Sequence, residues 1–264
     1  MKLVTTLRQF ASLITLGAAA FGATAVSTTA YANNEPQQVI RIGIENGYYP
    51  YEYINDKGEF VGLDVDLINF ICKEINAKCE LQRGAFEGLI PNLLFKKSDM
   101  VVSALSINDE RKKRVNFSTP YVGAKPGVYI VNNSSPTKNI SDLKVVGVQQ
   151  GTTLASYLMT LKGIEIKYYP SFDTAMLDLK GGRVEAVFES LDVAAKYLDD
   201  KSQKVQVLDE PIFDNIIGQG TGIAFRKSDK ELLAKVNKAL AKAKETGFLN
   251  ELAQKYGVRI DYGK

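Results

Sequence analysis

Short apolar runs alternate with amphipathic segments along most of this chain, and this alternation restricts its possible folds more than any other feature. Val39–Ile44, Asp99–Leu105, Lys144–Val148 and Val184–Phe188 have the composition of strands. Apolar residues recur at helical spacing in the segments Gly62–Ile75, Phe86–Lys97 and Phe172–Gly181, and Asn55–Gly58 is typical of a turn. Because strands that alternate with helices pair in parallel, the sequence predicts an α/β protein in which helices cover sheets.

The alternation starts twice along the chain. A first series of strands and helices covers residues 39–122, and a second series begins near Lys125-Pro126-Gly127. The glycine-rich segment Gly218–Gly222 suits a connection, and two amphipathic helices, Lys230–Thr246 and Phe248–Tyr256, follow it. The periodicity therefore suggests two α/β units.

The first 32 residues have the pattern of a secretory signal peptide. Lys2 and Arg8 give a basic start, residues 10–26 are apolar or small and uncharged, and Ala30-Tyr31-Ala32 is a small-x-small cleavage site. A membrane anchor is the alternative, but a run rich in Ala, Gly and Thr is weak for a membrane span. We expect export and cleavage after Ala32.

The charge balance and the missing residue types exclude several functions. The formal charge of +3 falls to +1 when Lys2 and Arg8 are lost with the signal peptide, and this near-neutral balance argues against nucleic acid as a partner. The chain has no histidine, which excludes Ser-His-Asp and Cys-His catalysis and the usual zinc sites. We therefore expect no metal and no cofactor.

The two cysteines, Cys72 and Cys79, are expected to form a disulfide, because an exported chain enters an oxidising compartment. The bond would close a short loop between a helix and the next strand and would stabilise the fold by about 2–3 kcal/mol. Two buried free thiols are the alternative.

Candidate ligand contacts follow the ends of the predicted strands, where open α/β sheets bind their ligands. Acidic, aromatic, hydroxyl and guanidinium side chains gather at these points. The candidates are Glu45 and Tyr48 after the first strand, Phe86 at a helix start, Ser103, Ala104, Ser106 and Arg111 after the third strand, and Gln149, Thr152, Thr153, Glu189 and Ser190 in the second unit.

These residue types suit a ligand that carries both charges. Arg111 can hold a carboxylate through two parallel hydrogen bonds. Tyr48 and Phe86 can enclose a flat or extended chain, and Glu45 would face a cation at its end. Taken singly, each residue also has an ordinary explanation, since Arg111 lies in a charged run and aromatic residues usually pack in cores.

Four motifs together resemble one known family. They are Gly62-Leu63-Asp64-Val65-Asp66-Leu67 with Ile71-Cys72 and Ile75, the segment Phe86–Leu93, the segment Ser103–Arg111, and the segment Val146–Thr153. Over about residues 39–257 the chain resembles the extracellular solute-binding proteins of family 3, the polar amino-acid receptors of ABC importers. The resemblance implies an α/β, two-lobed periplasmic-binding-protein fold of type II. Each lobe would be a mostly parallel sheet with flanking helices, and two hinge crossings would join the lobes.

The resemblance also divides the chain. Residues 38–122 and 220–264 would form lobe 1, and residues 126–215 would form lobe 2. The hinge segments would be about 123–125 and 216–219. In that family the two lobes close on a ligand by hinge bending.

Carried over from the family, Arg111 and the backbone amides around Ser106 and Thr153 would hold the α-carboxylate of an amino acid. An acid at Glu45, with aromatic residues at Tyr48 and Phe86, resembles receptors for arginine, lysine, ornithine and histidine. Glu in place of Asp at that position, together with Gln149, is most similar to arginine-binding members.

The chain departs from the family at the group that binds the ligand α-ammonium. The family usually places an acid after the strand that corresponds to residues 184–188. Here Ser190 has that place in ungapped register, whereas Glu189 or Asp192 would serve after a shift. We take Glu189 as the candidate, with Ser190 and Asp192 as alternatives.

The resemblance therefore implies a monomeric periplasmic receptor that binds a cationic L-amino acid, with arginine first, delivers it to an inner-membrane ABC permease and catalyses no reaction. The alternative is a periplasmic cyclohexadienyl dehydratase on the same scaffold, in which Glu189 would act as the acid. The set of Glu45, Tyr48 and Phe86 argues against it, because that substrate has no cationic tail. A receptor module of a sensor or transglycosylase is a third possibility, but such proteins carry extra domains.

Overall fold

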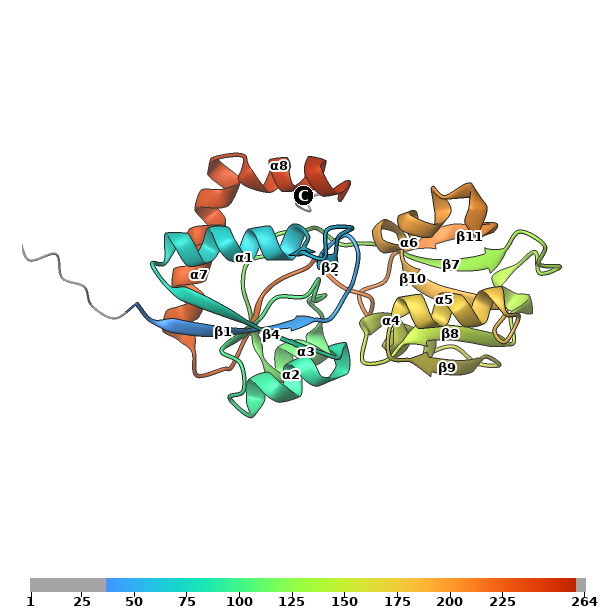
Figure 1. The fold of residues 1–264 in the computed structure, drawn as a ribbon. Helices are drawn as coiled ribbons and strands as arrows, with labels where there is room; N and C mark the ends of the chain where they lie inside the picture. Colours follow the sequence, from blue (N-terminus) through green and yellow to red (C-terminus); the bar gives the residue numbers. More distant parts are fainter. Residues whose placement is uncertain (1–36, 260–264) are drawn as a thin grey trace, which may run out of the picture. The chain divides into compact units, whose positions relative to one another are not determined.

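Two five-stranded sheets, each with flanking helices, organise the chain (Figure 1). The computed structural model describes residues 37–259, so the predicted signal peptide and its cleavage site lie outside the described residues. No helix within residues 37–259 is long and apolar enough to cross a membrane.

The first sheet has the strand order β4-β1-β5-β12-β6. Its strands are β4 (Lys78–Gly84), β1 (Val39–Glu45), β5 (Met100–Val101), β12 (Ala224–Phe225) and β6 (Asn116–Phe117). Strand β1 pairs in parallel with β4 and β5, and β12 is antiparallel to both of its neighbours. Four of the five strands therefore run in one direction, as the sequence predicts for a mostly parallel sheet.

Helices cover both faces of the first sheet. They are α1 (Leu63–Glu74), α2 (Phe86–Leu94), α3 (Asp109–Arg114), α7 (Lys230–Glu245) and α8 (Phe248–Tyr256). In Figure 1, α1 and α8 lie above the sheet and α2 and α3 lie below it. The predicted disulfide is confirmed, since Cys72 of α1 is bonded to Cys79 of β4. We call this sheet and its helices lobe 1.

The second sheet has the strand order β11-β7-β10-β8-β9. Its strands are β11 (Val205–Ile212), β7 (Gly127–Asn132), β10 (Ala186–Ser190), β8 (Val145–Gln149) and β9 (Glu165–Tyr169). Strands β8, β9 and β10 are parallel, and β7 is antiparallel to both β10 and β11. Here too four of the five strands run in one direction.

Lobe 2 consists of this sheet and its helices α4 (Thr153–Leu158), α5 (Phe172–Lys180) and α6 (Leu191–Leu198), with the 3-10 turns η1 (Ile140–Asp142) and η2 (Lys201–Gln203). Phe172, Ala175, Met176 and Leu179 are the buried residues of α5, as their helical spacing predicts. A capping box between Ser171 and Thr174 starts this helix.

Several elements differ from the sequence prediction. The helix expected at 86–97 ends at Leu94, and Lys96 has a left-handed backbone with φ of +59°. The strand expected at 99–105 is reduced to Met100–Val101. Strand β11 was not predicted, because exposed Asp209 and Glu210 and the following proline conceal its alternation at the sheet edge. A short hairpin of β2 (Tyr53–Ile54) and β3 (Phe60–Val61) surrounds the predicted turn.

The chain passes between the sheets twice. Strand β6 of lobe 1 leads to β7 of lobe 2, and β11 of lobe 2 returns to β12 of lobe 1. The two connections lie side by side, since Thr221 donates its N–H to the carbonyl of Val122 at 2.8 Å and accepts from the N–H of Tyr121 at 2.9 Å. The predicted hinge segments, 123–125 and 216–219, lie in these connections. Their role as hinges and the bounds of the two lobes stay predictions.

Candidate ligand-binding site

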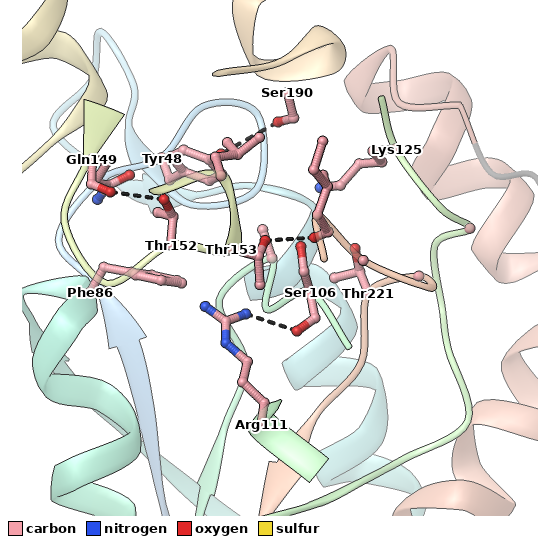
Figure 2. Close-up of a pocket in the computed structure, with 16 residues that line it drawn as sticks. Tyr48, Phe86, Ser106, Arg111, Lys125, Gln149, Thr152, Thr153, Ser190 and Thr221 are labelled. Atoms are coloured by element: carbon pink, nitrogen blue, oxygen red, sulfur yellow. Dashed lines mark hydrogen bonds between the residues drawn. The ribbon is translucent and has the colours of Figure 1, made fainter. Parts of the chain in front are cut away.

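A pocket lies beyond the carboxyl ends of strands from both sheets (Figure 2). Its walls come from lobe 1, from lobe 2 and from both connections between them. The lining residues are Tyr48, Phe86, Ala104, Ser106, Arg111, Gly123, Lys125, Gln149, Thr152, Thr153, Leu154, Ser190, Ile217, Gly218, Gly220 and Thr221.

Arg111 supplies a positive charge at one end of the pocket. The cap of α3 sets its place, because the Asn108 side chain accepts from the Arg111 N–H at 2.9 Å. The guanidinium donates to the carbonyl of Ser106 at 2.8 Å and to that of Gly151 at 3.1 Å. Burial lowers the pKa of Arg111 to about 10, so the group stays charged at neutral pH. Within residues 37–259 no carboxylate pairs with it, which leaves its charge available to an anion.

Hydroxyl groups lie close to this end. Thr152 is the N-cap of α4, and its Oγ1 accepts from the N–H of Ala155 at 3.1 Å. Thr153 donates its hydroxyl to the carbonyl of Ile217 at 2.6 Å. These two residues therefore fix the start of α4 and tie it to the second connection.

A carboxyl and an amide lie together at the ends of β1 and β8, and Figure 2 shows the amide, that of Gln149, on a different side of the pocket from Arg111. Glu45, at the end of β1, is 3% exposed, and its Oε1 accepts from Gln149 Nε2 at 2.6 Å. Glu45 Oε2 and Gln149 Oε1 have no hydrogen-bond partner within the described part of the chain. Burial raises the pKa of Glu45 to about 8. A bound cation could therefore satisfy both oxygens and favour the ionised carboxylate.

Glu189 lies behind the wall of the pocket. Its Oε1 accepts from the Tyr48 hydroxyl at 2.7 Å and from the N–H of Ser190 at 2.7 Å. Burial raises the pKa of Glu189 to about 7. Ser190, rather than Glu189, lines the pocket.

Nine of the twelve residues predicted from the sequence line this pocket, and three lie directly behind it. The three are Glu45, Glu189 and Ser103. The Ser103 hydroxyl accepts from the N–H of Glu45 at 3.1 Å and donates to the buried Glu52. Ser103 therefore supports the end of β1 from behind the pocket.

Sequence reasoning missed the residues that the two connections contribute to the pocket, and it also missed Leu154 of α4. The unpredicted lining residues are Gly123, Lys125, Leu154, Ile217, Gly218, Gly220 and Thr221. The sequence predicts that the glycine-rich run 218–222 is a connection, but it gives no sign that residues of this run line the pocket. Lys125 was expected only as part of the hinge segment 123–125 and of the start of the next strand. In the structure its Nζ donates to the Tyr51 hydroxyl at 3.0 Å and lies 3.5 Å from Asp192 Oδ2.

The arrangement can bind a small ligand with an anionic end at Arg111 and a hydrogen-bond-donating end at Glu45 and Gln149. In the described part of the chain, no three acidic or cysteine side chains are grouped so as to hold a metal ion.

Comparison with known proteins shows which family and which relatives this chain is similar to. The model of the bacterial extracellular solute-binding proteins, family 3, matches residues 40–259. ABC transporter arginine-binding protein 1 of Escherichia coli K12 is 36% identical over 222 residues, which are 82% of this chain and 90% of that protein. The histidine-binding periplasmic protein of the same strain is 38% identical over 232 residues, 83% of this chain and 87% of the relative. A solved Salmonella typhimurium periplasmic binding protein with high arginine specificity has a TM-score of 0.78 at 33% identity and covers 83% of this chain and 99% of its own.

Proposed function

Because this chain belongs to the bacterial extracellular solute-binding proteins of family 3, we propose that it is the substrate-binding component of an amino-acid ABC importer and binds a cationic L-amino acid, with arginine the first candidate. The receptor works as a monomer in the periplasm after cleavage behind Ala32. It delivers its ligand to an inner-membrane permease without catalysing a reaction.

One observation supports the proposed preference for a ligand with a cationic side chain. The two oxygens Glu45 Oε2 and Gln149 Oε1 are buried without a hydrogen-bond partner in the described chain, at the end of the site remote from Arg111. A guanidinium has several N–H donors in one plane, so it can reach both acceptors at once. Figure 2 shows the rings of Tyr48 and Phe86 on the Gln149 side of the pocket, where they can stack on that plane.

The relatives support the same class of ligand. The similar proteins named above are arginine-binding and histidine-binding, and a lysine/arginine/ornithine-binding periplasmic protein of Escherichia coli K12 is 34% identical over 244 residues, 88% of this chain and 92% of its own. All three names describe amino acids with a basic side chain. The Arg111 guanidinium supplies the complementary site for their shared α-carboxylate.

Calorimetric titration of the mature protein with arginine, lysine, ornithine, histidine and glutamine tests the proposal. We expect arginine to bind most tightly of these five and Glu45→Gln to weaken its binding about tenfold or more, because a charge-assisted hydrogen bond is lost. Glu59→Gln, in an exposed turn, is the matched control. Unchanged arginine affinity in Glu45→Gln would overturn the role of Glu45.

A second candidate function has one observation in its favour. Glu189 is buried beside the pocket, and its pKa of about 7 keeps part of the carboxyl protonated at neutral pH. Such a group could protonate the leaving hydroxyl of a cyclohexadienyl acid, which departs as water while carbon dioxide is released. Incubation with prephenate or arogenate, followed by detection of the aromatic product, decides this case. Product formation that Glu189→Gln abolishes would establish a dehydratase.

A further inference from the structure

Helix α3, which carries Arg111, is not anchored in lobe 1 by side chains of its own. Its six residues are all charged, and none of them belongs to the hydrophobic core. The residues that flank the helix, Ile107 and Val115, are buried and fix the two ends of the segment. Between these ends the orientation of the helix depends on polar contacts, and so does the position of the Arg111 guanidinium.

The second connection, which runs from β11 to β12, supplies several of these contacts. The side chain of Gln219 accepts from Lys112 Nζ at 2.5 Å, and its backbone N–H donates to the carbonyl of Ile107 at 2.8 Å. Ile107 in turn donates its N–H to the carbonyl of Gly220 at 2.7 Å. From lobe 1, Lys227 Nζ donates to the carbonyl of Lys112 at 2.6 Å. Helix α3 is therefore held by the second connection as well as by lobe 1.

Asn108 joins α3 to the same connection with both polar atoms of one side chain. Its Oδ1 accepts from the Arg111 N–H at 2.9 Å, which is the N-cap bond of α3, and its Nδ2 donates to the carbonyl of Ile216 at 3.1 Å. The residue is 5% exposed, so water competes little for either bond. Serine, threonine and aspartate also cap helices, but they have no amide donor. Capping alone therefore does not account for the second bond.

The other lobe holds the connection at the neighbouring residue. The Thr153 hydroxyl, at the start of α4, donates to the carbonyl of Ile217 at 2.6 Å, and Ile217 lines the pocket. Two successive carbonyls, those of Ile216 and Ile217, are thus held by a side chain of lobe 1 and by a side chain of lobe 2. Arg111 and Thr153, which we expect at the ligand α-carboxylate, are therefore both tied to one short stretch of the second connection.

We propose that Asn108 is a positioning residue, which fixes the Arg111 guanidinium relative to the second connection and so gives the site its full affinity for the carboxylate end of a ligand. The inference rests on the proposed function for the carboxylate at Arg111 but not on the basic tail at Glu45. A guanidinium that is already held in place loses little further freedom when the carboxylate binds. Without the Nδ2 bond, α3 shifts between its buried ends, and binding must first return Arg111 to its position.

Asn108→Ser separates the two bonds of this side chain, because serine keeps a hydroxyl that caps α3 but is too short to reach Ile216. We expect the midpoint of urea unfolding to stay near that of the native protein. Affinity for L-arginine should fall about fivefold or more, whereas affinity for agmatine, which is arginine without its carboxylate, should change by less than about twofold. Calorimetric titration measures both, with Asn133→Ser in an exposed loop as the matched control. Equal losses for the two ligands, or an unchanged arginine affinity, would overturn the proposal.

Hydrogen–deuterium exchange tests the same tie without any ligand. In ligand-free Asn108→Ser the amides of α3, residues 109–114, and those of residues 216–222 should exchange about threefold faster or more, because the contact between them is weakened. Exchange in α1, on the opposite side of the first sheet, should stay at the native rate (Figure 1). Native exchange rates in α3 of the variant would show that lobe 1 alone holds this helix, and the proposal would fail.

Failure of the proposed function gives a different result. If the native protein binds glutamine and not arginine, the cationic ligand class is wrong. A loss in Asn108→Ser that affects glutamine but not 4-aminobutanamide, which is glutamine without its carboxylate, would then still support the role of Asn108. If arginine binds tightly to the native protein and Asn108→Ser weakens arginine and agmatine equally, the proposed function stands and this inference fails.

Discussion

Under the proposed function, the Glu45 carboxyl would couple ligand binding to pH. Desolvation is the largest cause that raises its pKa to about 8, the Gln149 hydrogen bond opposes it, and Glu189, Glu87 and Asp173 add to it. A cationic tail at Glu45 would favour the ionised form and lower that pKa. Binding must then release a proton at any pH between the two pKa values, so the affinity for arginine rises with pH until the pH passes about 8.

We therefore expect the arginine association constant to increase between pH 6 and pH 8, by up to about tenfold per unit. Titration in buffers of different ionisation enthalpy measures the proton release directly. Glu45→Gln should remove most of the pH dependence, and Glu189→Gln reports the part due to the second carboxyl, whose pKa is about 7. An affinity independent of pH in the native protein would contradict this account of Glu45.

At the scale of elements, the start of α1 holds the loop that follows β5. Ala104 lines the pocket with a left-handed φ of +43°, and its N–H donates to Asp64 Oδ2 at 2.6 Å. Asp64 is fully buried in the first turn of α1, and burial raises its pKa to about 6. The acid of the helix motif therefore keeps a pocket loop in a backbone conformation that alanine rarely adopts.

Asp64→Ala should lower the free energy of unfolding by about 1–3 kcal/mol, because the buried N–H of Ala104 loses its acceptor. It should also weaken every ligand, since the loop would relax from its left-handed conformation. Asp64→Asn keeps an acceptor oxygen and should lose less of both, and exposed Asp56→Ala should lose neither. Urea unfolding and titration on the same samples give the two readouts. Equal effects of Asn and Ala at position 64 would show that the hydrogen bond is not the cause.

At the scale of the whole described unit, hydrogen bonds join the two lobes directly across the site. Tyr48 donates to Glu189 at 2.7 Å, Gln149 donates to Glu45 at 2.6 Å, and Tyr51 donates to Asp192. Each of these bonds joins a residue of lobe 1 to a residue of lobe 2, so each would favour a closed arrangement if the predicted hinges let the lobes open. Any ligand that binds only the closed arrangement has an affinity that depends on the equilibrium between the open and closed arrangements.

Tyr51→Phe removes one such bond from outside the pocket lining. We expect about tenfold weaker apparent binding of any ligand, because loss of one charge-assisted hydrogen bond shifts the lobes toward the open arrangement. Small-angle X-ray scattering should report a larger radius of gyration for the ligand-free variant and an unchanged one at saturation. Tyr53→Phe is the control. If the ligand-free Tyr51→Phe variant is as compact as the native protein, the hydrogen bond between Tyr51 and Asp192 does not hold the lobes together.

Much of this architecture was predictable from local pattern. The spacing of Leu67 and Ile71 places one face of α1 in the core, and both residues are fully buried. Glu45, Gln149 and Ser190 were found as candidates because each ends a buried strand. Strand β11 was missed because packing on one face is enough to hold an edge strand whose sequence is half polar.

Local pattern determined where β1, β8 and β10 end and which side chains follow them, and it favoured a disulfide between Cys72 and Cys79 over two free thiols. Periodicity reports burial along the chain, and burial sets the strands, the helices and the sheet edge that carries the site. Only the tertiary structure decided that Lys125 stands in the pocket wall, because Tyr51 and Asp192 hold it from 74 and 67 positions away. It also decided that Glu189 accepts a hydrogen bond from Tyr48 while Ser190 lines the pocket. The charge of a pocket depends on groups brought together from distant parts of the sequence, and no local pattern contains that information.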